Sequence, residues 1–308
     1  MLKLVSSLWR VACRTTGSLL ILALAGCASV SPPGLQIDTT HTSVSQDSRA
    51  QFLVIHYTQA NFELSMKILA RGGLSVHYLL SDETPPRIYR LVDENRRAFH
   101  AGFSSWQGQG PLNAMSIGIE IVHPGVLPGP EGERFVPYRQ DQIDALIPLV
   151  KDIVQRHRIR PDRVVGHNDI APQRKVDPGP LFPWKRLADE GLILWPQEAL
   201  VAQHRARFEQ SLPDVAWFQQ SLAAQGYEVP RHGTLDEPTR RVVATFQMKY
   251  RPERYDGQPD AQTAALLQAL APAPRPGAAP PAAPPAPAPG APPALGTAPL
   301  TPPPPLPR

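Results

Sequence analysis

The chain has 308 residues, which is enough for one large domain or two smaller ones. Its 38 prolines exceed the average share, and nearly half of them follow Leu270, so the folded part is shorter than the chain. The net charge of +4 includes Lys3, Arg10 and Arg14 of the first segment, and no basic stripe is interleaved with aromatic residues, which argues against nucleic-acid binding.

Residues 1–26 are typical of an export signal. Basic residues precede the apolar run 19–25, which is too short to span a bilayer comfortably. The run ends in the letters LAGC, and small residues directly before Cys27 resemble the bacterial lipobox, in which the cysteine becomes a lipidated N-terminus after cleavage. A plain signal peptide with an incidental cysteine is the alternative. Because Ala28 rather than an aspartate follows the cysteine, we expect an outer-membrane lipoprotein that faces the periplasm.

The mature protein is expected to contain no disulfide. The chain has 2 cysteines, of which Cys13 would leave with the signal and Cys27 would carry the lipid. Stability must then come from burial of a core, even in an oxidising compartment. Residues 27–48 are polar, contain a Pro-Pro-Gly break and show no sustained period, so they predict a tether that gives an anchored domain some reach.

Residues 49–195 predict an α/β domain with a single mixed β-sheet covered by helices. A helical stripe of apolar residues covers Arg139–His157, where Pro148 should kink or divide the helix, and a short helix is expected at Leu181–Leu187. The β-branched and aromatic runs that predict strands are Gln51–Thr58, Ser75–Leu80, Ile88–Val92 and Ser116–Val122. Both faces of the first run are apolar, which favours a central strand.

Two of these strands carry a polar residue where an apolar one is expected. His56 interrupts the first strand near its end, and it is either a core histidine or a functional one. Glu120 lies inside the fourth strand, where an unpaired carboxylate is costly to bury, so it lies at a solvated edge or in a polar pocket. Gly118, on the same face as Glu120, leaves room for a ligand and favours the pocket.

The loop Gly166–Trp184, with the letters GHNDIAPQRKVDPGPLFPW, follows a short apolar strand. Its prolines and glycines cannot continue a helix or sheet, so the loop is stiff and presents its side chains. His167 and Asp177 are metal-ligand types, and Lys175 lies two residues before Asp177. One histidine and one aspartate alone would describe an ordinary polar loop.

The predicted strands supply the other candidate residues of the site. Catalytic zinc takes three protein ligands of nitrogen or oxygen type, and His56, His167 and Asp177 satisfy that set. Glu120 could move a proton from water to a leaving amine, and Lys175 could stabilise an oxyanion, so these parts suit amide hydrolysis. The same ligand set also admits cobalt or nickel.

The strings VIHYT, HAG, NAMSIGIEIV and GHNDIAPQRKVDPGPLFPW resemble the zinc-dependent N-acetylmuramoyl-L-alanine amidases of the type shared with AmpD and the peptidoglycan-recognition proteins. The resemblance covers most of residues 27–270. It implies hydrolysis of the amide between the lactyl group of N-acetylmuramic acid and L-alanine, in peptidoglycan or muropeptides. It further implies that His56, His167 and Asp177 bind zinc and that Glu120 and Lys175 are the catalytic pair. His100 is a candidate substrate contact or a packing residue. Arg174 could meet a stem-peptide carboxylate or tie down its loop.

Residues 196–270 predict a small C-terminal all-α domain of three helices. The spacing G-x-x-D-x-x-T occurs twice, and each Asp is expected to cap the helix that follows the turn. This pattern resembles the helical peptidoglycan-binding domain of wall hydrolases, and a purely structural role is the alternative. Residues 271–308 are rich in proline and alanine, cannot bury a core, and predict a disordered tail.

The sequence therefore predicts a lipid-anchored zinc amidase that acts in cell-wall turnover or recycling, with peptidoglycan or a muropeptide as substrate. The membrane is contacted through Cys27, and no obligate protein partner is inferred. A non-catalytic peptidoglycan-binding protein is the alternative, although such relatives typically lack a zinc ligand. A zinc hydrolase for small amides is a third possibility, which leaves the C-terminal helices unexplained.

Overall fold

The computed structural model describes residues 35–129 and 132–271. The chain divides into two compact units between Gln46 and Asp47, and residues 35–46 of the first unit form neither helix nor strand. The predicted signal, Cys27 and nearly all of the predicted tail lie outside the described residues. None of the helices in the described ranges is both long and apolar enough to cross a membrane.

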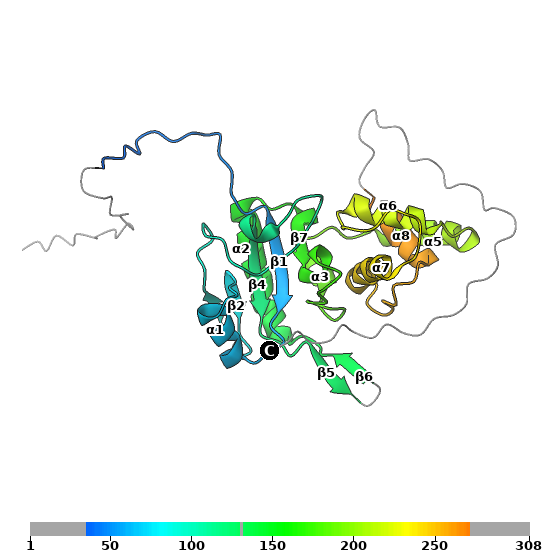
Figure 1. The fold of residues 1–308 in the computed structure, drawn as a ribbon, viewed down its shortest axis with the longest axis horizontal. Coiled ribbons are helices and arrows are strands. Elements are labelled where there is room, and N and C mark those ends of the chain that lie inside the picture. Colours follow the sequence, from blue (N-terminus) through cyan, green and yellow to red (C-terminus); the bar gives the residue numbers. More distant parts are fainter. Residues whose placement is uncertain (1–34, 130–131, 272–308) are drawn as a thin grey trace, which may run out of the picture. The chain divides into compact units, whose positions relative to one another are not determined.

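The second unit contains a five-stranded mixed sheet in the order β3-β2-β4-β1-β7 (Figure 1). The pairs β2–β4, β4–β1 and β1–β7 are parallel, and β3 pairs with β2 antiparallel. The five strands are β1 Phe52–Tyr57, β2 Tyr78–Leu80, β3 Ile88–Arg90, β4 Ser116–Ile121 and β7 Val164–Gly166. The mixed sheet and the interior position of β1 are confirmed.

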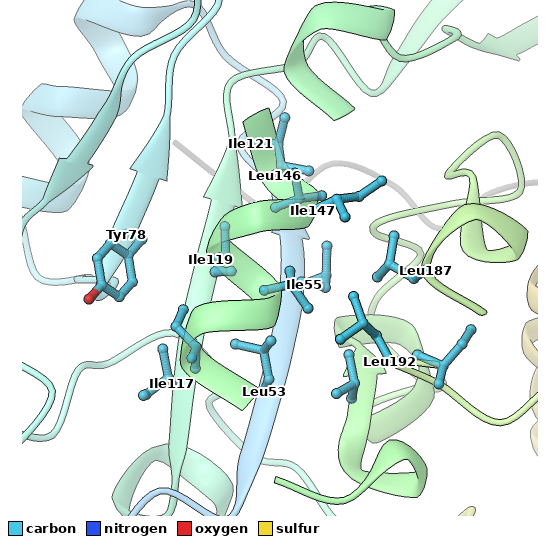
Figure 2. Packing of buried hydrophobic residues seen from close by; sticks show 14 of the residues in the cluster. Leu53, Ile55, Tyr78, Ile117, Ile119, Ile121, Leu146, Ile147, Leu187 and Leu192 are labelled. Atoms are coloured by element: carbon cyan, nitrogen blue, oxygen red, sulfur yellow. The ribbon is translucent and has the colours of Figure 1, made fainter. Parts of the chain in front are cut away.

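One face of the sheet packs against helix α2, Gln140–His157. Alternation along β1 places Leu53 and Ile55 on this face, where they meet isoleucines of β4 and Leu146 of α2 (Figure 2). The other face carries Phe52, Val54 and His56, so the histidine lies opposite the α2 core. Pro148 lies inside α2 without dividing it, so the prediction that it divides the helix is wrong and the prediction of a kink stays open.

Helices cover the sheet and continue into the C-terminal part of the chain. The remaining elements before residue 195 are α1 Phe62–Arg71, η1 Leu112–Ala114, the antiparallel pair β5 Val126–Gly129 and β6 Gly132–Phe135, η2 Pro161–Arg163, α3 His167–Ile170 and α4 Trp184–Asp189. The C-terminal helices are α5 Glu198–Gln210, α6 Val215–Gln225, α7 Glu237–Tyr250 and α8 Ala261–Ala269. The three predicted helices are α6, α7 and α8, and α5 precedes them as a helix the sequence analysis did not predict.

The repeated G-x-x-D-x-x-T motif builds two equivalent turns. Asp236 accepts the N–H of Thr239 at 2.9 Å, and Asp260 accepts that of Thr263 at 2.8 Å, so both predicted caps are confirmed. A buried glutamine completes each turn: it accepts the glycine N–H and donates to the threonine hydroxyl, as Gln219 does for Gly233 and Thr239 and Gln247 does for Gly257 and Thr263. The motif is therefore accounted for by local hydrogen bonding.

Candidate metal centre

The three predicted ligands converge. His56 lies on β1, and its two neighbours in the sheet are β4, where Glu120 is its register partner, and β7, which ends one residue before His167. The loop after α3 then returns, and the N–H of Asn168 donates to the carbonyl of Asp177 at 2.8 Å. Parallel strands that end together thus bring both histidines to one place, and a backbone hydrogen bond adds the aspartate.

Their ligand atoms form a nearly equilateral triangle. The Nδ1 atoms of His56 and His167 are 2.9 Å apart, and Oδ2 of Asp177 lies 3.2 Å from the first and 3.1 Å from the second. Tetrahedral zinc with bonds of about 2.0–2.1 Å separates its ligand atoms by about 3.3 Å. The three side chains are buried, and the observed triangle is only slightly smaller than the one that zinc requires.

The hydrogen bonds made by the other ring nitrogens show why a cation fits. Nε2 of His167 faces the carbonyl oxygen of Ala101 at 3.3 Å, and this oxygen can only accept. Nε2 of His56 lies 2.9 Å from Nδ1 of His100. If both Nε2 atoms carry the proton, both Nδ1 atoms present lone pairs to each other and to a carboxylate, an arrangement that a metal ion stabilises.

His100 continues this chain of hydrogen bonds to the backbone. Its Nε2 lies 3.1 Å from the hydroxyl of Ser116, which donates to the carbonyl of Leu112 at 2.7 Å. Because that carbonyl only accepts, the hydroxyl proton points to it, and Nε2 of His100 must donate to Ser116. Nδ1 of His100 is then free to accept from His56. This series of hydrogen bonds therefore selects the tautomer of His56 whose Nδ1 can bind a metal.

The space beside Gly118 is filled by protein. A Cβ atom at this position would lie 2.6 Å from Nδ1 of His100, so the absence of a side chain makes room for the imidazole. The sequence analysis expected a ligand in that space, and this expectation is corrected. His100 is only 9% exposed, and both of its ring nitrogens are bonded within the protein. These contacts favour its packing alternative over a substrate contact.

The protonation states agree with a metal site. Burial, together with the nearby His167, lowers the pKa of His56 to about 4, so its imidazole is neutral at neutral pH. Burial alone would raise the pKa of Asp177, but His167 and His56 outweigh it and hold that pKa well below its usual range. A neutral imidazole and an ionised carboxylate are the forms that bind metals.

Glu120 lies next to the triangle with an unused oxygen. Its Oε2 is buried and has no hydrogen-bond partner among the described residues, while the side chain as a whole is partly buried. Burial raises the pKa of Glu120 well above its usual range, Asp177 adds to this effect, and the positive charge of Lys175 opposes it. Glu120 therefore lies on an interior strand of the sheet, close to the charges of Asp177 and Lys175, and not at the edge of the sheet.

Arg174 and Lys175 differ in their surroundings. The guanidinium of Arg174 donates to the carbonyls of Ala101 and Phe103, which supports the predicted alternative that it ties down a loop. Lys175 is partly buried and, within residues 35–129 and 132–271, its ammonium makes no ion pair or hydrogen bond. Its positive charge thus acts on Glu120 without an internal partner among the described residues.

Sequence reasoning missed two groups of residues around the ligands. Ser116 completes the hydrogen-bond chain from His56, yet a serine at the start of a strand carries no signal. Asp169, two residues after His167, is 1% exposed and bonds Lys249 of α7 and Tyr227. The acidic residue is visible in the loop, but its partners lie far along the chain and share no motif with it.

Comparison with known families agrees with this architecture. A family model described as N-acetylmuramoyl-L-alanine amidase matches residues 46–180, which include every predicted metal ligand and catalytic residue. A second model, described as "Putative peptidoglycan binding domain", matches residues 211–267 and so covers α6, α7 and α8.

Individual relatives match over most of their length. The chain is 44% identical over 255 residues to the N-acetylmuramoyl-L-alanine amidase AmiD of Escherichia coli strain K12, covering 80% of this chain and 92% of that protein. The structure of AmiD from E. coli with the substrate anhydro-N-acetylmuramic acid-L-Ala-D-γ-Glu-L-Lys matches with a TM-score of 0.70 and 42% identity, covering 78% of this chain and 96% of that one. AmpDh3 from Pseudomonas aeruginosa in complex with anhydromuramic pentapeptide matches with a TM-score of 0.71 and 40% identity, covering 77% and 97% respectively.

Proposed function

The chain belongs to the zinc-dependent N-acetylmuramoyl-L-alanine amidases, and from this premise we propose how its own residues divide the reaction. The enzyme hydrolyses the amide between the lactyl group of N-acetylmuramic acid and L-alanine, in the turnover or recycling of cell wall. The observation that carries the proposed site is the triangle of His56, His167 and Asp177, whose atoms lie 2.9–3.2 Å apart.

These three residues would hold the zinc ion. The donor set of two imidazoles and one carboxylate fits this ion, which in catalytic sites takes three protein ligands. When bound, zinc supplies Lewis acidity that polarises the substrate carbonyl and eases the deprotonation of water. The protein's contribution is to keep the two imidazoles in the correct tautomer and to exclude bulk water from the buried triangle.

Glu120 is the proposed general base and acid. Its unpartnered Oε2 is free to accept a proton from the attacking water and to pass it to the nitrogen of L-alanine as the amide breaks. Burial raises the pKa of Glu120 above its usual range, and a raised pKa suits a carboxyl group that must both take and release a proton. Lys175, whose ammonium has no ion pair or hydrogen bond with the residues that the structure describes, would stabilise the oxyanion that forms on the lactyl carbonyl.

The test begins with the purified mature protein and a muropeptide. It should release the stem peptide, lose this activity on treatment with a chelator, and recover it with zinc. Glu120→Ala should retain zinc and lose about 10²–10⁴-fold in turnover, the usual contribution of a positioned acid or base. If no defined muropeptide is cleaved, the chain is instead a non-catalytic peptidoglycan-binding protein. Substrates that differ only in the 1,6-anhydro ring would show whether this chain shares the ligand class of its two structural relatives.

We further propose that residues 49–195 form the catalytic domain and residues 196–270 a domain that contacts peptidoglycan, as the second family model supports. The catalytic domain would be attached to the outer membrane through lipid on Cys27 and the tether 27–48. Labelling of cells with a radioactive fatty acid tests the anchor. The wild-type protein should incorporate label and Cys27→Ala should not, and equal labelling of both would reject the lipid site.

A further inference from the structure

Helix α3, which begins with His167, is a single turn of four residues. So short a helix is not stable by itself and depends on its tertiary contacts. The β7 side contributes one of these contacts, because the backbone N–H of Gly166 donates to Oδ2 of Asp169 at 2.8 Å. The other donors to this carboxylate come from the C-terminal helical region.

Two side chains of the helical region reach the carboxylate of Asp169. Nζ of Lys249, on α7, lies 2.8 Å from Oδ2, and the hydroxyl of Tyr227, just after α6, donates to Oδ1 at 2.7 Å. Burial raises the pKa of Tyr227 well above its usual range, as does the neighbouring Asp169, so the phenol remains a donor. Every oxygen of Asp169 is thus engaged, and two of the three donors lie outside the catalytic domain.

This cluster is buried. The side chains of Lys249 and Asp169 are 6% and 1% exposed, and the ammonium also lies 4.3 Å from the centroid of the Trp184 ring. A lysine with so little exposure is rare unless it is paired, and removing one partner of such a pair leaves an uncompensated charge. The pair is therefore a fixed attachment between α7 and the loop Gly166–Trp184.

The attachment at Asp169 is close in sequence to two parts of the metal site. His167 precedes Asn168, whose backbone N–H holds the carbonyl of Asp177, and Asn168 precedes Asp169. The amide of Asn168 also faces the sulfur of Met248 at 3.9 Å, and Figure 1 draws α3 beside α7. A displacement of Asp169 would thus move the ligand His167 and the backbone that orients the ligand Asp177.

We propose that the C-terminal helical region is a structural part of the metal centre, in which Lys249 and Tyr227 are positioning residues that fix α3 and hence His167. This inference rests on the metal ligands proposed above. It assigns the helical region a role beyond contact with peptidoglycan. Loss of either contact should loosen zinc even in the absence of any cell-wall substrate.

The test uses the full-length mature protein, with Tyr227→Phe and Lys249→Met as the variants. Zinc affinity is measured by competition with a chromophoric chelator, and ligand geometry by the visible absorption of the cobalt-substituted protein. Residues that orient metal ligands usually contribute about 10- to 100-fold to affinity, so each variant should lose that much and show an altered cobalt spectrum. Arg205→Met removes an exposed cation of α5 that pairs with Glu209, and it should leave both readouts unchanged.

The two possible failures can be told apart. If His167→Ala binds zinc as tightly as the wild type, the proposed ligand set is wrong. If His167→Ala loses zinc but folded Tyr227→Phe and Lys249→Met retain wild-type affinity and spectrum, only the positioning role is wrong. Circular dichroism establishes folding before each measurement. Should Lys249→Met not fold, Tyr227→Phe, which removes only a hydroxyl group, decides the question.

Discussion

Nε2 of His56 and Nδ1 of His100 lie 2.9 Å apart, and this contact determines which nitrogen of His56 faces the metal site. The proton on Nε2 is specified by a chain that ends at a backbone carbonyl, through His100 and Ser116. A histidine ligand commonly depends on such an outer partner, which is usually a carboxylate or a carbonyl. Here the outer partner is a second imidazole, that of His100, which is only 9% exposed.

His100→Phe should lower zinc affinity by about 10- to 100-fold, because the ring volume remains but the acceptor for His56 is lost. The measurement is chelator competition on folded protein. His123→Phe is the matched control, since His123 is also buried but stacks on Tyr138 rather than on a ligand. Equal affinity of His100→Phe and wild type would return His100 to its alternative as a substrate contact.

Gly118→Ala should disturb the same chain from the strand side. The new Cβ would lie 2.6 Å from Nδ1 and 2.7 Å from Cγ of His100, so the ring must move away from His56. Overpacking of this kind costs about 1–3 kcal/mol of unfolding free energy. We expect a lower midpoint in urea together with weaker zinc binding. Gly73→Ala, where an added Cβ meets no atom within 4 Å, is the control. An unchanged zinc affinity in Gly118→Ala would mean that the position of the ring is unimportant.

Lys175→Met should reduce turnover by about 10²–10³-fold and leave zinc content unchanged, because the residue is proposed to act on the oxyanion rather than on the metal. Steady-state hydrolysis of a muropeptide and metal analysis of the same sample provide the two readouts. Lys185→Met, which removes an exposed lysine paired with Asp189, should retain full turnover. A loss of zinc in Lys175→Met would assign the lysine to the structure of the site instead.

The parts of the fold that could be predicted are those whose sequence signals lie in neighbouring residues. The strand Phe52–Tyr57 was predicted to within one residue at each end, and the aspartate caps of α7 and α8 were also predicted, because both signals lie in adjacent residues. The hairpin of β5 and β6 was missed, since Pro128 and Gly132 obscure any alternation. Helix α5 was missed because its residues are mostly polar and only Phe208 among them is buried.

Some residues of the site could likewise be predicted from neighbouring residues, and others could not. His56 and Glu120 are predictable because each breaks an apolar strand, and their proximity follows from parallel pairing of β1 with β4. The role of His100 is not predictable, because a histidine in the short string HAG gives no sign that it fills the space beside Gly118. Lys249 is a similar case, since a lysine within a helix usually faces solvent, and its burial depends on a carboxylate 80 residues earlier in the chain.

Acid should destabilise the protein through His77, which is fully buried and whose Nδ1 accepts the N–H of Gly118. Burial lowers the pKa of His77 to about 4, whereas an unfolded histidine titrates near 6.5. Between these values the unfolded state binds the proton and the folded state does not. The contribution of neutral His77 to the free energy of unfolding is therefore complete above pH 6.5 and is lost as the pH falls towards 4.

Urea unfolding of the metal-free protein between pH 7.5 and 4.5 measures this effect. Neutral His77→Gln should be less stable at pH 7.5 because it loses a buried hydrogen bond, but its unfolding free energy should depend less steeply on pH. The difference in slope is at most about 1.4 kcal/mol per pH unit, which corresponds to one proton. Parallel curves for wild type and His77→Gln would show that His77 is protonated as easily in the folded protein as in the unfolded chain.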